Sequence, residues 1–326
     1  VSVVLSETCR RLADSAFEAC DALETIRLPP SVSFVGEKAF AYSGLRTVEG
    51  AAGVSDVMMC WFFGNCPGPM NEAAGELAFA DFSQTEDAFL LDLARPDWGE
   101  DAEEVSSLWK GFTEAFQNYP LCVRMQYYGP LSASLMWPLE PDVEMQRLHQ
   151  VWRPLEHPLG DTIGMCLNRF TLNEALLLHR RMAAAATAKT EQGDDRLESL
   201  ERKYADNRAR LLDVGVMKTF RRQTEAAENA LAFYLLRSEG ICQSREWGNA
   251  AMARESVGKM RDIAVREIAA TEKYLPVLRR DSRLGFQSEA EAHIFHPAIL
   301  EWRLVDLRRT IRRLGEIDSI LAAGKP

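Results

Sequence analysis

Apolar residues recur at helical spacing throughout the second half of the chain. Beyond Thr171 they return every three or four residues in five successive segments, which short polar breaks separate. This period is typical of amphipathic helices, and Thr171 with Glu174 forms the capping pattern of a helix start. Five helices with short connections predict an antiparallel helical bundle over residues 166–326.

The breaks between these segments predict where helices end. One helix is predicted over residues 197–211, and a later one over Glu255–Tyr274 stops before Pro276, because proline removes a helical hydrogen bond. The last helix begins near Pro297, and we expect its apolar stripe to be buried against the helices of residues 171–275. The stripe consists of Leu300, Leu304, Leu307, Ile311 and Leu314, with Arg303, Arg308, Arg309, Arg312 and Arg313 at the intervening positions.

A continuous apolar run, Val57–Phe63, differs from the helical segments. Its length and the glycine that follows it predict a buried strand. We expect this strand to pair with the sheet of the preceding repeats. Two helices are predicted after it. The first begins at the capping pair Ser83 and Glu86 and ends at Gly99, and the second covers residues 100–118.

The first fifty residues repeat themselves. A shift of 23 residues aligns apolar or small positions, such as Val3 with Ile26 and Leu12 with Val35. Each unit contains a short alternating segment that is typical of a strand, and its apolar side needs stacked neighbours to be buried. Because two units are too few for a stable stack, we expect further units before Val1.

This repeat resembles a known family. The positions that carry the resemblance are Leu12, Ala16, Phe17, Cys20, Leu23, Ile26, Leu28, Pro29, Val32, Val35 and Gly36. At these positions, residues 1–50 resemble the BspA-like leucine-rich repeats of bacterial surface proteins. The resemblance implies a stacked β-solenoid used for binding, a packed thiol at Cys20, and an extracellular or cell-surface location. The pattern departs at Ser43, where the family has a second cysteine.

A second resemblance covers residues 57–321. The segments that carry it are Cys60–Phe79, Leu108–Pro120, Tyr127–Pro130 and Asp281–Ala292. They are similar to the C-terminal part of bacterial glycoside-hydrolase-like proteins, in which residues 60–65 would end a late strand of a (β/α)8 barrel, where barrel enzymes bind ligands. By this resemblance Trp61 would stack on a sugar ring, and Asn65 would bind sugar hydroxyls. The alternative is that Trp61 belongs to the core.

A charged loop precedes the last helix. Within it, Asp281 and Arg283 are candidate ligands for a carbohydrate or a carboxylate. The alternative is a turn held by ion pairs between helix ends. A short helix is predicted from Ser288, and on it Glu289, His293 and His296 would share one face. Because the HExxH pattern is absent, no metal site is predicted.

Composition narrows the function classes further. The net charge of −10, with the whole acidic excess in residues 1–170, argues against nucleic-acid binding. No apolar run is long enough to predict a membrane span. The seven cysteines form no CxxC pair, which argues against a zinc ribbon. No phosphate-binding loop or nucleophile elbow is found, and no cofactor is expected.

These observations predict a mainly α protein, an antiparallel helical bundle with a short N-terminal β leucine-rich-repeat segment. Its expected parts are residues 1–50, the repeats; residues 51–165, a buried strand with a helical linker region; and residues 166–326, the bundle. The first functional hypothesis is a non-catalytic C-terminal portion of a carbohydrate-active bacterial protein. The alternative is a surface binding or adhesion module that contacts a glycan or a protein. The third and least favoured hypothesis is an enzyme. The two carboxylates that glycoside hydrolysis needs would lie on other strands of the barrel, which this chain lacks.

Overall fold

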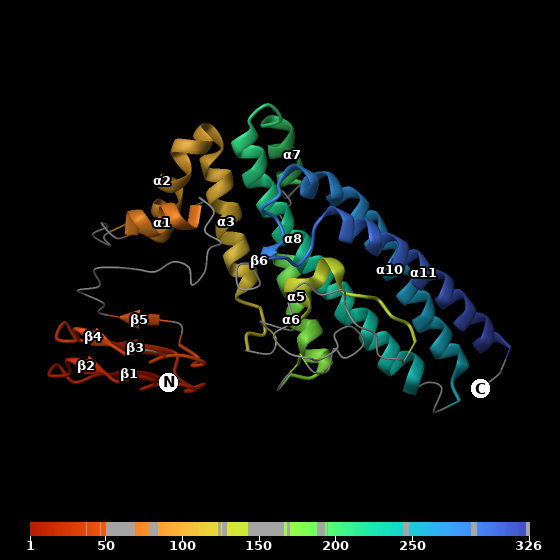
Figure 1. Cartoon of the computed structure of the whole chain (residues 1–326), viewed down its shortest axis with the longest axis horizontal. Helices are drawn as coiled ribbons and strands as arrows, with labels where there is room; N and C mark the ends of the chain where they lie inside the picture. The colour runs from red at the N-terminus through yellow and green to blue at the C-terminus, as the bar shows by residue number, and fades with distance from the viewer. Residues whose placement is uncertain are drawn as a thin grey trace. The chain divides into compact units, whose positions relative to one another are not determined.

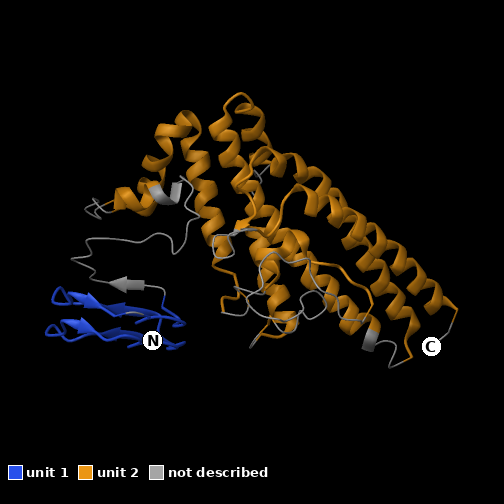
Figure 2. Ribbon diagram, in the orientation of Figure 1, with its two compact units in different colours: residues 1–59 blue, residues 60–326 orange. Residues whose placement is uncertain are grey.

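A computed structural model of the chain shows a mainly helical protein with short parallel sheets near the N-terminus (Figure 1). It describes residues 1–36, 38–45, 47–49, 69–77, 84–122, 125, 129–142, 166–167, 170–187, 193, 195–243, 248–287 and 292–323. The chain divides into two compact units, residues 1–59 and 60–326, shown in Figure 2.

The N-terminal unit consists of short strands stacked in parallel. Strands β1 (Ser2–Val4), β3 (Thr25–Arg27) and β5 (Thr47–Glu49) form one sheet, and β2 (Arg11–Leu12) and β4 (Phe34–Val35) form another. The pairing of β1 with β3 and of β2 with β4 joins residues 23 apart, which confirms the shift predicted from the sequence. The spacing between paired residues of β3 and β5 is one residue shorter than 23. Strand β5 therefore belongs to a third repeat, which the shift of 23 residues did not identify.

The turns of the first two repeats in the N-terminal unit share one backbone geometry. Ser15 and Lys38, equivalent positions one repeat apart, both have a positive φ, of 57° and 56°. The backbone N–H of Phe17 donates to the carbonyl of Ala39 at 2.7 Å, and the rings of Phe17 and Phe40 stack with centroids 5.6 Å apart. The units are therefore held together by turn hydrogen bonds and ring stacking as well as by strand pairing.

Burial differs between equivalent positions of the stack. Ile26 on the central strand is fully buried, whereas its counterpart Val3 on the edge strand is half-buried. Cys20 is exposed, so the packed thiol that the family resemblance implied is wrong for this residue. Cys20 directly follows the turn over residues 14–19, outside the paired strands, and its side chain is exposed there. Ser43, the equivalent residue of the second unit, is half-buried.

The helical unit begins with α1 (Pro69–Leu77), α2 (Glu86–Trp98) and α3 (Ala102–Phe116), with one 3-10 turn between α2 and α3. Thr85 caps α2 by accepting a hydrogen bond from the backbone of Ala88. Ser83, for which the capping role was predicted, lies outside the described residues. The end of α2 at Gly99, whose φ is 54°, confirms the prediction. Short helical turns at Pro130–Ala133 (α5) and at Ser134–Met136 follow.

The capping box of Thr171 and Glu174 is confirmed at the start of α6 (Leu172–Ala185). The single helix predicted over residues 197–211 is wrong, because α7 (Arg196–Lys203) ends at Tyr204 and α8 (Arg208–Leu235) begins anew. The side chain of Asn207 accepts a hydrogen bond from the backbone of Arg210 and caps that second start. A π-helical segment, Leu236–Gln243, continues α8.

Two long helices complete the unit, α10 (Ala250–Arg280) and α11 (Pro297–Ala322). The predicted helix end before Pro276 is wrong, because α10 runs through this proline. Leu275 and Leu278 on either side of it are buried in one cluster with Leu300 of α11. This burial offsets the hydrogen bond that proline removes from the helix.

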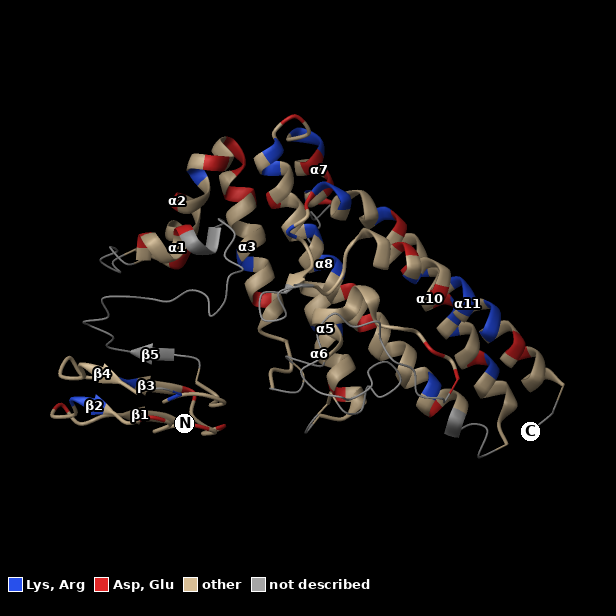
Figure 3. Cartoon of the chain, in the orientation of Figure 1, with Lys and Arg blue, Asp and Glu red and all other residues tan. Residues whose placement is uncertain are grey.

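The leucines of the apolar stripe predicted on α11 are buried, as expected, whereas Ile311 of the same stripe is only half-buried. Its leucines 300, 304, 307 and 314 belong to two core clusters that also contain residues of α8 and α10. Arg303 is an exception among the intervening arginines, because it is buried and only 4% exposed. On the outer side, charges of both signs follow α10 and α11 (Figure 3). Arg254 pairs with Asp318 there at 2.8 Å.

Candidate functional site

The predicted ligand residues fall in two parts of the chain. Trp61 and Asn65 lie outside the described residues, and so does the strand predicted over Val57–Phe63. Asp281 and Arg283 are described, directly after α10. The geometry of the candidate site can therefore be built at the second pair.

Asp281 and Arg283 bind each other. Oδ1 of Asp281 accepts hydrogen bonds from the backbone N–H and from Nε of Arg283, at 3.0 and 2.9 Å, and Oδ2 accepts one from Nη2 at 2.8 Å. Asp281 is buried. Burial alone would raise its pKa, but the hydrogen bonds from Arg283 hold that pKa below its ordinary value. The arrangement favours the turn held by an ion pair over the ligand-binding loop.

The short helix predicted from Ser288 is wrong where the structure describes it. Residues Ala292–His293 form strand β7, which pairs antiparallel with β6 (Phe286–Gln287). His296 occupies the N-cap position of α11 without a side-chain capping hydrogen bond, and His293 lies on strand β7, so the two share no helix face. Nε2 of His293 lies 2.8 Å from the carbonyl oxygen of Ser282, which closes the hairpin. Within the described part of the chain, no group of three metal-ligating side chains is found.

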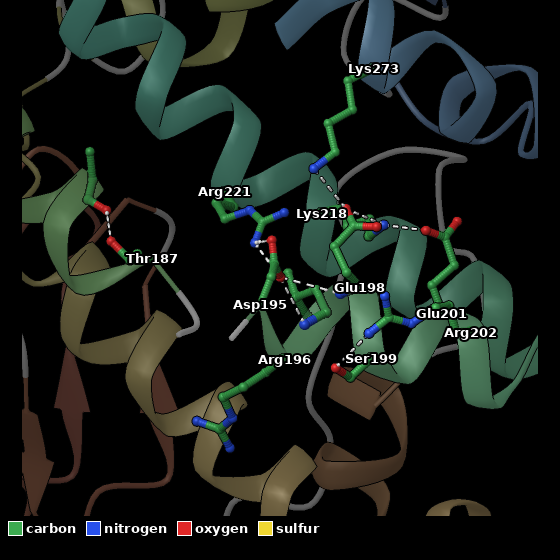
Figure 4. A network of polar contacts seen from close by, with 12 residues as sticks. Thr187, Asp195, Arg196, Glu198, Ser199, Glu201, Arg202, Lys218, Arg221 and Lys273 are labelled. Carbon is green, nitrogen blue, oxygen red and sulfur yellow. Dashed lines mark hydrogen bonds and ion pairs between the residues drawn. The ribbon is translucent and has the colours of Figure 1, made fainter. Parts of the chain in front are cut away.

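An ion-pair network joins α7 to α8 and α10 (Figure 4). Lys218 of α8 is buried and lies 2.9 Å from Glu198 of α7, and it also pairs with Glu201 of α7. From α10, Lys273 lies 3.2 Å from Glu198, and Arg280 lies 2.8 Å from Glu201. Burial alone would raise the pKa of both glutamates, but Lys218 holds them below their ordinary values. The network attaches a short helix to two long ones.

A charged groove of about 330 Å³ lies between the segment that follows Trp137 and α11. Arg313 of α11 forms a fork on Asp142, with Nε–Oδ2 and Nη2–Oδ1 distances of 2.8 Å. These bonds lower the pKa of Asp142, whereas burial raises the pKa of the neighbouring Glu140. Both carboxylates and guanidinium groups line the groove, so it selects neither cations nor anions by charge.

A buried polar cluster lies inside the helical core. Oε2 of Glu267, on α10, accepts hydrogen bonds from Arg222 of α8 at 2.6 Å and from Arg303 of α11 at 3.0 Å. Asn229 donates to Oε1 at 2.7 Å. Burial alone would raise the pKa of Glu267, but the two arginines lower it to about 2. The sequence did contain a signal, since each of the three charged residues lies at an apolar-face position of its helix.

The repeat unit presents an aromatic and basic surface. The guanidinium carbon of Arg11 lies 4.0 Å from the ring centroid of Phe34, its partner across the β2–β4 pair. Phe34 and Val35 are each 43% exposed, whereas Leu12 is buried. A guanidinium group over an aromatic face is a cation–π contact. An exposed ring with an adjoining positive charge can contact the apolar face of a ligand and its carboxylate together.

Comparison of the chain with known proteins adds no assignment to these surfaces. No protein-family model, no curated protein and no solved structure matches the chain. Among the residues with described positions, no helix combines the length and the apolar character that crossing a membrane requires. The function is therefore argued from the geometry of the two units.

Proposed function

We propose that the chain is a non-catalytic binding protein, in which the repeat unit contacts the ligand and the helical unit is a scaffold. The observation that carries the proposal is the parallel pairing of strands one repeat apart. Stacking of this kind places equivalent side chains beside one another and builds an extended surface, which repeat proteins use for binding. In finer terms, we assign the first unit to the BspA-like leucine-rich repeats and the second to antiparallel helical bundles.

The ligand we propose is a glycan, with a surface protein as the alternative. Arg11 covers one face of the Phe34 ring, so the remaining exposed part of the ring offers the apolar contact for a sugar, and the guanidinium group offers hydrogen-bond donors for a carboxylate. An acidic sugar unit combines these two features. The resemblance of residues 57–321 to glycoside-hydrolase-like proteins supports the same ligand class, and it leads us to propose that the chain belongs to the non-catalytic portion of a carbohydrate-active protein.

Two acidic residues of the helical unit support a non-catalytic role. Glycoside hydrolysis normally uses two carboxylates on opposite sides of the scissile bond, one of which must be protonated. Glu267 and Asp281 are the buried carboxylates of the described helical unit, and both bind arginine. Their lowered pKa values make these two residues poor general acids. Burial raises the pKa of Glu140, Asp213 and Glu228 instead, so a test for hydrolysis must include these three carboxylates.

The test is binding of the full chain to immobilised acidic and neutral glycans, with Phe34→Ala and Arg11→Ala variants. Each variant should weaken binding to an acidic glycan about tenfold, the loss expected when about 1.4 kcal/mol of contact is removed. Arg27→Ala is the matched control, because Arg27 is also exposed in the repeat unit but lies on the other sheet. Unchanged affinity of the Phe34→Ala variant would refute this surface as the binding site.

A further inference from the structure

The charges of the buried cluster do not balance. Glu267 is fully buried, Arg303 is 4% exposed and Arg222 is 5% exposed. Arginine stays protonated in proteins, and the lowered pKa of Glu267 keeps it ionised, so these three groups carry one net positive charge inside the core. Asp306 of α11 also attracts Arg303 through its charge, but this carboxylate is half-buried in the lining of the charged groove and makes no hydrogen bond to the cluster among the described residues. An uncompensated charge in a helical core is strongly unfavourable.

The same two arginines have unsatisfied hydrogen-bond donors. Nε and Nη1 of Arg222 and Nε of Arg303 are buried, and within the described structure they have no hydrogen-bond partner. Nη1 of Arg303 donates to the carbonyl oxygen of Trp137, whose own Nε1 is buried and unpaired. Buried donors of this kind are rare in folded proteins unless an unseen ligand or water accepts their hydrogen bonds.

We propose that the core binds a small monovalent anion of the halide class beside Arg222 and Arg303. One such anion would balance the net charge and accept hydrogen bonds from the unpaired N–H groups of both arginines. A phosphate or sulfate is less suitable, because it carries more negative charge than the one positive charge of the cluster. The site is separate from the repeat surface and does not depend on the proposed binding function.

The test is thermal unfolding of the full chain in sodium bromide and in sodium gluconate, at equal ionic strength. Gluconate is monovalent but too large for an enclosed site. An anion that binds only the folded state raises the melting temperature with the logarithm of its concentration. At bromide concentrations above the dissociation constant, we expect each tenfold increase in bromide concentration to raise the melting temperature of the parent by about 3 °C or more.

Two variants separate this site from general salt effects. Arg222→Met leaves the neutral pair of Glu267 and Arg303, so its melting temperature should no longer respond specifically to bromide. Arg254→Met removes the same charge from an exposed position of α10 and should respond like the parent. Equal responses of all three proteins would overturn the proposal.

A crystallographic measurement on the parent decides the question even if Arg222→Met does not fold. In crystals grown in sodium bromide, an anomalous peak within hydrogen-bond distance of Arg222 and Arg303 is expected. An ordered water at that place, without an anomalous signal, would overturn the proposal. Glycan binding by the repeat unit can fail while the bromide peak is present, so the two proposals are tested independently.

Discussion

Replacing Leu307 by alanine tests how the last helix is held. Leu307 is 2% exposed and belongs to the cluster that also contains Trp137, Leu231 and Ile263. The truncation removes apolar carbons worth about 2.5 kcal/mol, at about 0.8 kcal/mol for each buried methylene. The cavity that remains adds a further cost, since large-to-small core substitutions of leucine reach about 5 kcal/mol. We therefore expect the free energy of unfolding to fall by about 3–4 kcal/mol.

Urea unfolding followed by far-UV circular dichroism measures this change, because most of the helical signal comes from the second unit. With a denaturant slope of about 3 kcal/mol per molar, the unfolding midpoint of Leu307→Ala should fall by about 1 M. Arg309→Ala is the control on the same helix. Arg309 is exposed, and its substitution should change the free energy of unfolding by less than about 0.5 kcal/mol.

Two results would refute this reasoning. The first is a midpoint for Leu307→Ala that equals that of the parent, which would mean that the stripe of α11 contributes little to the core. The second is a loss of stability that depends on protein concentration. That dependence would place the stripe of α11 between two copies of the chain instead of within one.

The remaining predictions concern both units. Glu267 has a pKa of about 2 in the folded protein against an ordinary 4.5, so its stabilisation is complete above pH 4.5 and is lost as the pH falls towards 2. The stability of Glu267→Gln should therefore not show this loss between pH 4.5 and pH 2. At neutral pH the free energy of unfolding of the variant should be about 3–5 kcal/mol lower than that of the parent. Gly36→Ala should destabilise the repeat unit by about 1–3 kcal/mol, because the new Cβ would collide with the backbone of Asp14. Limited proteolysis measures this change, and Gly75→Ala is the control, because no atom lies within 4 Å of a Cβ at Gly75. The chain should not hydrolyse aryl glycosides. Measurable hydrolysis that is lost when one Asp or Glu of the chain is replaced would contradict this prediction.

Local signals in the sequence predicted much of the fold. The 23-residue shift, the capping box at Thr171 and the leucine stripe of α11 each depend on residues close in sequence or on a simple period, and the structure confirms them. The strand predicted over Val57–Phe63 stays a prediction. The end predicted before Pro276 was wrong because the proline rule is local, whereas burial of its neighbours depends on α11.

The buried cluster shows why part of the candidate site was missed. The apolar period of a helix shows that Glu267 lies on an inward face, but it does not show which residue of another helix meets it. Arg222 and Arg303 lie 45 and 36 residues from Glu267 in the sequence. Asp281 and Arg283, only two residues apart, could be identified in advance as an ion pair or a ligand site, and the structure favours the ion pair.

The turns of the repeat unit have a consequence for how it folds. Ser15, Ala19, Lys38 and Tyr42 all have a positive φ although none is glycine. Each left-handed residue of this kind costs about 1–2 kcal/mol, and an isolated unit has no neighbour whose hydrogen bonds offset that cost. The units must therefore fold together, in a transition that is cooperative along the stack. A single unit removed from its neighbours would lose its turns first, and with them the surface that they align.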